Sequence, residues 1–129
     1  MIPKPQEIAV VFNVADIERT ERFYRDTLGL DVTRQEGAEP FWLIADLTAG
    51  SQLIFFQSDD VRPGNTPIVV FDLKAGGIDD LITALAEQGV TIVTPVSEAP
   101  GGWSADFLDP DGNALAFWQR AEVPRSLKG

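Results

Sequence analysis

Asp109, Asp111 and Asn113 alternate along a short segment and could supply oxygen ligands to a calcium ion. An EF-hand calcium loop needs a glycine at its sixth position and a bidentate glutamate at its twelfth. Here Gly112 comes at the fourth position and Arg120 stands at the twelfth. The segment is therefore interpreted as a tight turn that joins two strands, because its proline presets the backbone and its glycine tolerates a left-handed conformation.

A second acidic pair, Asp59 and Asp60, could suggest catalysis by two carboxylates. The pair is followed by the turn-forming run Arg62-Pro63-Gly64-Asn65. This composition is typical of a solvated connection, so we interpret residues 59–66 as a linker.

The chain contains neither histidine nor cysteine. This composition excludes disulfides, thiolate nucleophiles, the commonest metal ligand and the usual acid–base group at neutral pH. We therefore predict no metal, no cofactor and no catalytic residue, and we lean against an enzyme.

The net charge is −10, from 20 acidic and 10 basic residues. This charge repels phosphate backbones and anionic lipid and mildly favours cationic ligands. The sequence also lacks a long apolar run and a basic, apolar leader. We expect a cytoplasmic protein that binds neither nucleic acid nor membranes.

The first half of the chain predicts the element order βαβββ. Residues 8–14 are apolar and β-branched, as in a strand, and Asp16 can cap a following helix that ends at Gly29. Glu21 and Arg25 have the spacing of an ion pair on the wet side of that helix. Further strands are expected at residues 30–35, 41–47 and 52–57.

The second half repeats this order. A strand at residues 68–73 precedes a helix that carries Ile78, Ile82 and Leu85 on one face and closes at Gly89. Three further strands are predicted, at residues 90–94, 104–108 and 114–119.

The residues of the two halves also match. Val10-Val11-Phe12-Asn13-Val14 aligns with Val69-Val70-Phe71-Asp72-Leu73, and Leu53-Ile54-Phe55-Phe56-Gln57 aligns with Leu115-Ala116-Phe117-Trp118-Gln119. We infer an internal duplication. We expect one domain, residues 1–129, with module one at 7–58, the linker at 59–66, module two at 67–120 and a loose polar tail at 121–129.

Residues 23–30 read Phe-Tyr-Arg-Asp-Thr-Leu-Gly-Leu, and residues 109–113 read Asp-Pro-Asp-Gly-Asn. These segments, one in each half, resemble the glyoxalase, bleomycin-resistance and extradiol-dioxygenase superfamily, also called vicinal oxygen chelate. The resemblance implies an α+β fold in which two βαβββ modules form an eight-stranded cup with the helices outside. It leaves open whether the modules pair within one chain or across a dimer.

Enzymes of that superfamily hold a divalent metal with His, Glu or Gln from the first and last strands of each module. The resemblance places these ligand positions at Ala9, Ile54, Ile68 and Ala116. None of these side chains offers a lone pair to a metal. A shift of one residue brings in only other apolar neighbours, so we treat the four as lost metal positions.

Strand alternation predicts which side chains line the cup. The family's ligand positions put Val11 and Asn13 of the first strand on the cup face, and Phe55 and Phe117 beneath the helices. The residues predicted to bind a ligand are Val11, Asn13, Trp42, Phe56, Trp103, Asp106 and Trp118. Trp103 is expected in a permissive loop after Pro100, and the orientation of Asp106 depends on Ala105 and Phe107 facing the core.

We hypothesise a metal-free, homodimeric binding protein of the bleomycin-resistance type. It would sequester an aromatic, neutral or cationic small molecule and so confer antibiotic resistance. The alternative is a glyoxalase-like lyase or isomerase with an unconventional site formed by Asn13, Asp72 and Asp106. A third possibility is an accessory module that binds a partner and fills its cup with its own side chains.

Overall fold

The computed structural model describes residues 8–48, 50–59 and 68–128. The chain divides into two compact units, Met1–Arg62 and Pro63–Gly129. Apart from Asp59, the predicted linker lies outside the described residues.

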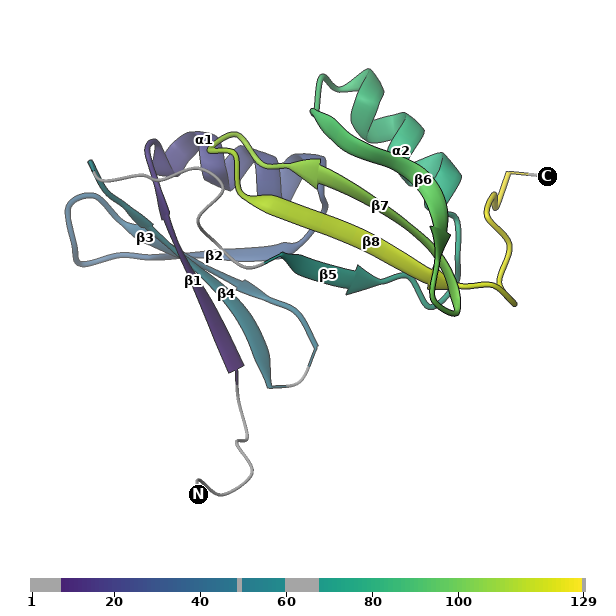
Figure 1. Cartoon of the computed structure of the whole chain (residues 1–129). Coiled ribbons are helices and arrows are strands. Elements are labelled where there is room, and N and C mark those ends of the chain that lie inside the picture. Colours follow the sequence, from purple (N-terminus) through teal and green to yellow (C-terminus); the bar gives the residue numbers. More distant parts are fainter. Residues whose placement is uncertain (1–7, 49, 60–67, 129) are drawn as a thin grey trace. The chain divides into compact units, whose positions relative to one another are not determined.

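The first unit contains one four-stranded sheet and one helix (Figure 1). The chain order is β1 (Ile8–Val14), α1 (Ile17–Glu21), a π-helical continuation η1 (Arg22–Thr27), β2 (Asp31–Gln35), β3 (Trp42–Asp46) and β4 (Ser51–Gln57). In the sheet the strands lie in the order β1-β4-β3-β2, with β1 parallel to β4 and the other pairs antiparallel.

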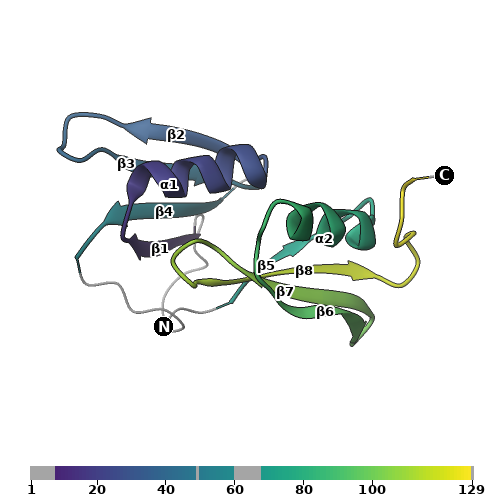
Figure 2. The same cartoon turned by 90° about the horizontal axis from the view of Figure 1, so that it is seen from above.

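The second unit repeats this arrangement. Its elements are β5 (Val69–Asp72), α2 (Ile78–Glu87), β6 (Ile92–Ala99), β7 (Gly102–Leu108) and β8 (Ala114–Arg120), and the sheet order is β5-β8-β7-β6. The predicted α+β fold with two βαβββ modules is confirmed. In both units the helix lies over one face of its own sheet (Figure 2).

Strand pairing reproduces the predicted alignment of the two halves. In the first unit Val11 pairs with Ile54, and in the second unit the aligned residues Val70 and Ala116 pair in the same parallel way. The two sheets therefore share their strand order and the register of their parallel pairs, whereas the β6–β7 pair has register shifts that the β2–β3 pair lacks.

The core of each unit lies between its helix and its sheet. Phe12 and Phe55 are fully buried and stack with their ring centroids 5.5 Å apart, and Tyr24 of η1 lies 4.3 Å from Phe55. In the second unit the buried helix residues are Ile78, Ile82 and Leu85, and the buried strand residues include Ala105, Phe107, Leu115 and Phe117. The prediction that Phe55 and Phe117 pack beneath the helices is confirmed.

One glutamine caps the helix of each unit. The side-chain oxygen of Gln57 accepts a hydrogen bond from the amide of Ile17, at 3.0 Å, and Gln119 accepts from Ile78, at 2.9 Å. Gln57 is the last residue of β4 and Gln119 is the last but one of β8, and the two positions are aligned. Each one satisfies an amide that a helix leaves without an internal partner.

The tail that follows β8 was predicted to be loose, and this prediction is wrong. The carbonyl groups of Pro124 and Arg125 accept hydrogen bonds from the amides of Gly77 and Asp79 at the start of α2. Asp80 accepts hydrogen bonds from the amide of Leu127, at 2.7 Å, and the hydroxyl of Ser126. These two hydrogen bonds lower the pKa of Asp80, and the bond from the Leu127 amide has the larger effect. The tail is therefore held against the start of α2 by these hydrogen bonds.

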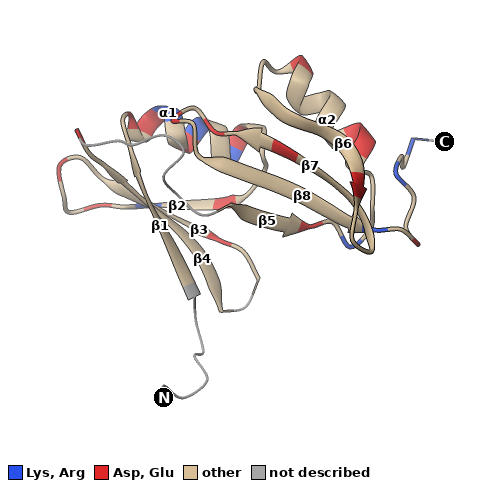
Figure 3. Cartoon of the chain, viewed as in Figure 1, with Lys and Arg blue, Asp and Glu red and all other residues tan. Residues whose placement is uncertain are grey.

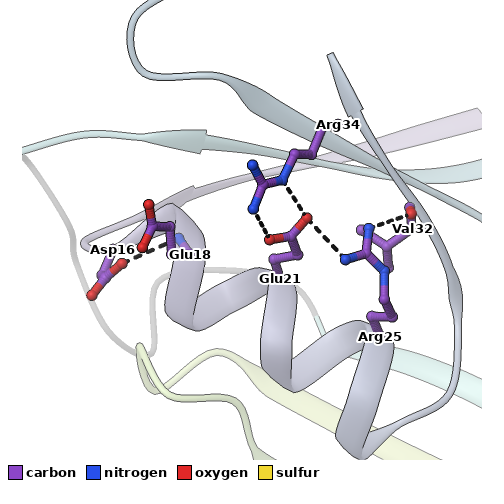
Figure 4. Close-up of polar contacts among 6 residues, drawn as sticks. All are labelled: Asp16, Glu18, Glu21, Arg25, Val32 and Arg34. Atoms are coloured by element: carbon purple, nitrogen blue, oxygen red, sulfur yellow. Dashed lines mark hydrogen bonds and ion pairs between the residues drawn. The ribbon is translucent and has the colours of Figure 1, made fainter. Parts of the chain in front are cut away.

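Glu21 and Arg25 form the predicted ion pair, at 3.0 Å, but Glu21 is buried, with 5% of its surface exposed. Arg34 of β2 donates two hydrogen bonds to the same carboxylate, at 2.7 and 2.8 Å (Figure 4). The bonds from Arg34 lower the pKa of Glu21 against the opposite effect of burial. The expectation of a wet helix face is wrong at this position because β2 brings a second cation to it.

The turn between β7 and β8 confirms the prediction for residues 109–113. The Asp109 carboxylate accepts hydrogen bonds from the amides of Asp111 and Asn113, at 2.9 and 2.8 Å, and from the Asn113 side chain. Gly112 has a φ of +82°, a conformation that glycine adopts without strain. The Asp109 carboxylate therefore stabilises the turn by accepting hydrogen bonds from residues of the turn itself.

Candidate functional site

Each sheet has one face that is opposite its helix, and we call this the open face. In the first unit the open face carries Val11, Asn13, Trp42, Ile54 and Phe56, since their strand neighbours Phe12, Leu43 and Phe55 are fully buried on the helix side. Val11 is 53% exposed and Phe56 is 39% exposed. The rings of Trp42 and Phe56 stack with centroids 5.1 Å apart and planes at 27°. This unit therefore presents an apolar, aromatic surface to solvent.

The open face of the second unit is more polar. Asp72 and Ser104 pair with Trp118 from either side, and Asp106 pairs with Ala116. Ala105 and Phe107 are fully buried on the helix side, so Ser104 and Asp106 share the open face with Trp118. The predicted orientation of Asp106 required Ala105 and Phe107 to face the core, and both do.

A cavity of about 430 Å³ lies at the end of this open face. It is lined by Asp72 at the end of β5, Lys74 in the following turn, and Trp118 and Arg120 of β8. The indole N–H of Trp118 donates a hydrogen bond to the carbonyl of Pro100, at 3.3 Å. The ring is thereby held in one orientation beside three charged side chains.

Trp103 does not lie on the open face. β7 begins at Gly102, and its register with β8 is continuous, so Trp103 alternates to the same side as Ala105. The guanidinium of Arg125 covers its ring at 4.0 Å from the centroid. The placement of Trp103 in a permissive loop is therefore corrected: it is a strand residue that the tail covers.

The four residues that the resemblance places at the family's metal-ligand positions carry only methyl and methylene groups. Ile54 and Ala116 lie on the open faces, Ala9 lies in β1, and Ile68 directly precedes β5 and is 54% exposed. Among the described residues no group of three or more His, Cys, Asp or Glu side chains is arranged to hold a metal ion. The residues present do not fit the divalent metal of the superfamily's enzymes.

Sequence reasoning missed Lys74 and Arg120. Arg120 follows Trp118 by two residues in a strand, so alternation places both side chains on one face. Lys74 follows Asp72 by two residues, beyond the end of β5. Strand alternation therefore gives a sequence signal for Arg120, whereas Lys74 lies outside the strand and has no such signal.

The structure thus brings Trp42 and Phe56 together in the first unit and Asp72 and Trp118 together in the second. Val11 and Asn13 lie on the open face of the first unit, and Asp106 lies on that of the second. Among the described residues no helix is long and apolar enough to cross a membrane.

Comparison with known proteins gives one family. The model of the Glyoxalase/Bleomycin resistance protein/Dioxygenase superfamily matches residues 8–117. No curated protein matches the sequence.

Many solved structures are similar to this one. TnmS3, an antibiotic binding protein from Streptomyces sp. CB03234, is 28% identical, with a TM-score of 0.70 over 92% of this chain and 97% of its own. A glyoxalase/bleomycin resistance protein from the same organism is 26% identical, with a TM-score of 0.70 over 88% of this chain and 99% of its own. A glyoxalase/dioxygenase from Nostoc punctiforme, at 20% identity, shares the fold, with a TM-score of 0.73 over 92% of each chain.

The family match covers residues 8–117 and so includes both βαβββ modules, whose strand order is the same. The chain therefore belongs to the glyoxalase, bleomycin-resistance and dioxygenase superfamily.

Proposed function

We propose that this protein binds and sequesters an aromatic small molecule, without a metal and without transforming it. The observation that carries the proposal is the stacked pair of Trp42 and Phe56 on the open face of the first unit. Large aromatic rings on a solvent-facing sheet cost solubility and contribute nothing to the core of their own unit, which lies on the opposite face. A ligand that stacks on these rings would remove their apolar surface from water.

The chemistry of the surface fits an aromatic ligand. A planar ring gains area burial and favourable stacking geometry against an indole or phenyl ring. Small-molecule sites combine such apolar surface with a few polar groups that fix orientation. Asn13 in the first unit and Asp106 in the second are polar residues on the open faces and can serve this role.

The lost metal positions support binding over metal-dependent chemistry. Ala9, Ile54, Ile68 and Ala116 cannot polarise a substrate oxygen or activate water. The similar protein TnmS3 is described as an antibiotic binding protein, which is consistent with a sequestering role. We extend the proposal to a cytoplasmic homodimer that protects its cell from an antibiotic.

Quenching of tryptophan fluorescence across a panel of aromatic antibiotics and metabolites tests the proposal. For a compound that binds, Trp42→Ala should weaken binding at the first unit by about tenfold, and Trp118→Ala should do the same at the second unit, because each removes a stacking surface. Trp103→Phe is the matched control, since Trp103 lies on the helix side of its strand, and it should leave the affinity unchanged. Equal affinity in all three variants would contradict binding at the open faces.

Elemental analysis tests the metal-free part of the proposal. We expect no stoichiometric metal after purification without chelators, because the four ligand positions are apolar. One equivalent of tightly bound zinc, nickel or iron would overturn it.

A lyase or isomerase without a metal is the second candidate function. It is favoured by one observation: Asp72 and Asp106 lie on the same open face and flank β8 from two sides. Mass spectrometry of a bound compound separates the two functions. Recovery of the compound unchanged supports sequestration, whereas turnover that Asp72→Asn or Asp106→Asn abolishes supports catalysis.

A further inference from the structure

The cavity of the second unit has a charge pattern that the proposed function does not explain. Its lining combines two cations, Lys74 and Arg120, with one carboxylate, Asp72, beside the indole of Trp118. The second unit has only four basic residues, Lys74, Arg120, Arg125 and Lys128, against nine acidic ones. Half of its cations therefore gather at one cavity. Figure 3 shows basic segments of this unit where β5 and β8 end and along the tail.

These two cations are available to a ligand. Arg125 is engaged, since it pairs with Asp79 at 3.0 Å and covers the ring of Trp103. By contrast, the part of the chain that the structure describes gives no ion pair or side-chain hydrogen bond to Lys74, Arg120 or Asp72. Solvent-exposed cations of this kind are stabilised when an anion replaces their water.

The aligned positions in the first unit carry no charge. The strand alignment matches Asp72 with Asn13, Lys74 with Ala15, Trp118 with Phe56, and Arg120 with Ser58. Folding of a βαβββ module thus does not require these charges. The aromatic ring is the one feature that both units keep.

We infer that the ligand of the second unit carries an acidic group, such as a carboxylate or phenolate, beside its aromatic ring. The inference rests on the proposed function and deepens it. The ring packs against Trp118, the acidic group contacts Arg120 and Lys74, and Asp72 accepts a hydrogen bond from a hydroxyl or amine of the same ligand. An arginine can bind a carboxylate through two parallel hydrogen bonds.

The net charge of −10 favours a cationic ligand only from a distance. Salt screens charges beyond about 8 Å at physiological ionic strength, whereas groups in contact are screened much less. The local cations therefore outweigh the overall acidity once the ligand is in the cavity. The inferred ligand therefore carries an anionic group, in place of the neutral or cationic ligand predicted from the sequence.

The test uses three compounds with one ring system: 2-naphthoate, 2-naphthamide and 2-naphthylmethylammonium. Titration calorimetry of the full chain, with an NMR titration for weak binding, should show that the carboxylate binds about tenfold more tightly than the amide. The ammonium compound should bind most weakly. Arg120→Gln and Lys74→Gln should each remove the preference for the carboxylate, so that the carboxylate and the amide bind with similar affinity.

Lys128→Gln is the matched control, because it removes one cation of the same unit outside the cavity, and it should keep the preference. Trp118→Ala should weaken the binding of all three compounds. Circular dichroism checks that each variant folds. If the compounds bind and respond to Trp118→Ala but show no preference for the carboxylate, the inference fails and the proposed function stands. If 2-naphthoate does not bind at millimolar concentration, or if Trp118→Ala has no effect on its binding, both fail at this site.

Discussion

The two units share one topology and the register of their parallel strand pairs, yet they are more alike on the helix side than on the open face. On the helix side both units bury apolar residues at aligned positions, such as Phe55 and Phe117 in the last strand of each module. On the open face, the aromatic stack of the first unit corresponds to a charged cavity in the second. The helix side must fill a core, whereas no packing requirement limits the open face, so the latter is where the units could diverge.

The second sheet is also longer at one end. The alignment matches Leu43 with Ala105, so β7 begins two residues earlier than β3, and β8 extends to Arg120 where β4 stops at Gln57. This extension places Arg120 in a strand beside Gly102. The cavity therefore depends on added sheet length as well as on changed side chains.

Gly102→Ala should have the largest effect on stability. A Cβ at Gly102 would collide with the carbonyl oxygen of Gln119 and would lie 2.8 Å from the Cα of Arg120, both in the backbone of β8. We expect a loss of more than about 3 kcal/mol in the free energy of unfolding, measured by urea titration.

Gly89→Ala is the control for that substitution. Gly89 has a φ of +83° and nothing within 4 Å of an added Cβ, so we expect a loss of about 1 kcal/mol, from backbone strain alone. Similar losses for the two variants would show that β7 and β8 do not approach as closely as described.

The two capping glutamines should differ in importance. Gln119 is fully buried and also donates a hydrogen bond to the carbonyl of Val123, at 3.0 Å, so Gln119→Leu leaves two backbone groups without partners. We expect Gln119→Leu to cost about 2–3 kcal/mol in thermal or urea unfolding. The exposed Gln57 can be replaced by water, so Gln57→Leu should cost about 1 kcal/mol or less. Equal costs would contradict this difference between the units.

Glu21→Gln should destabilise the first unit at pH 7, because it removes the charge that Arg34 and Arg25 bind. The loss should be limited to about 1–2 kcal/mol, because both arginines are about half exposed and recover some hydration. Ile82, buried, holds the aligned position of α2, so the second unit has no equivalent ion pair there. The folded pKa of Glu21 is lowered, so its contribution is present above the unfolded value and is lost as the pH falls through the folded pKa. Urea unfolding from about pH 7 to 3 should show a shallower acid loss in Glu21→Gln than in the wild type. Parallel curves would refute the assignment.

Loss of the Asp80 charge should have the smallest effect, because it loosens only the tail. The pKa of Asp80 is lowered below the usual 3.8 by the Leu127 amide, so its hold on the tail is present above the unfolded pKa and is lost as the pH falls through the folded pKa. The protection of the Leu127 amide against hydrogen exchange, taken relative to the intrinsic exchange rate at each pH, should therefore fall in acid and, at neutral pH, in Asp80→Asn. Asp106→Asn, on the open face, should leave this exchange unchanged. A Leu127 amide insensitive to both acid and Asp80→Asn would mean that the tail is held by other contacts.

Much of the fold could be predicted from the sequence because it depends on local patterns. The alternation of apolar and polar residues placed Phe55 and Phe117 beneath the helices and Ile54 and Trp118 on the open faces. The turn at residues 109–113 followed from its proline and glycine. Prediction failed for Trp103 because Pro100 and two glycines suggested a loop, whereas pairing with β8 extends the strand through Gly102.

The sequence by itself determined the two βαβββ modules, the apolar character of the family's ligand positions and the side of each strand that faces its helix. These properties follow from residue type and from periods of 2 and 3.6 residues, which are local. The tertiary structure alone decided that the tail caps α2, that Arg34 reaches the buried Glu21 and that Lys74 joins Trp118 and Arg120 around one cavity. Each of these contacts joins residues that are distant in the chain or lie beyond the end of a strand, so only strand pairing and packing bring them together.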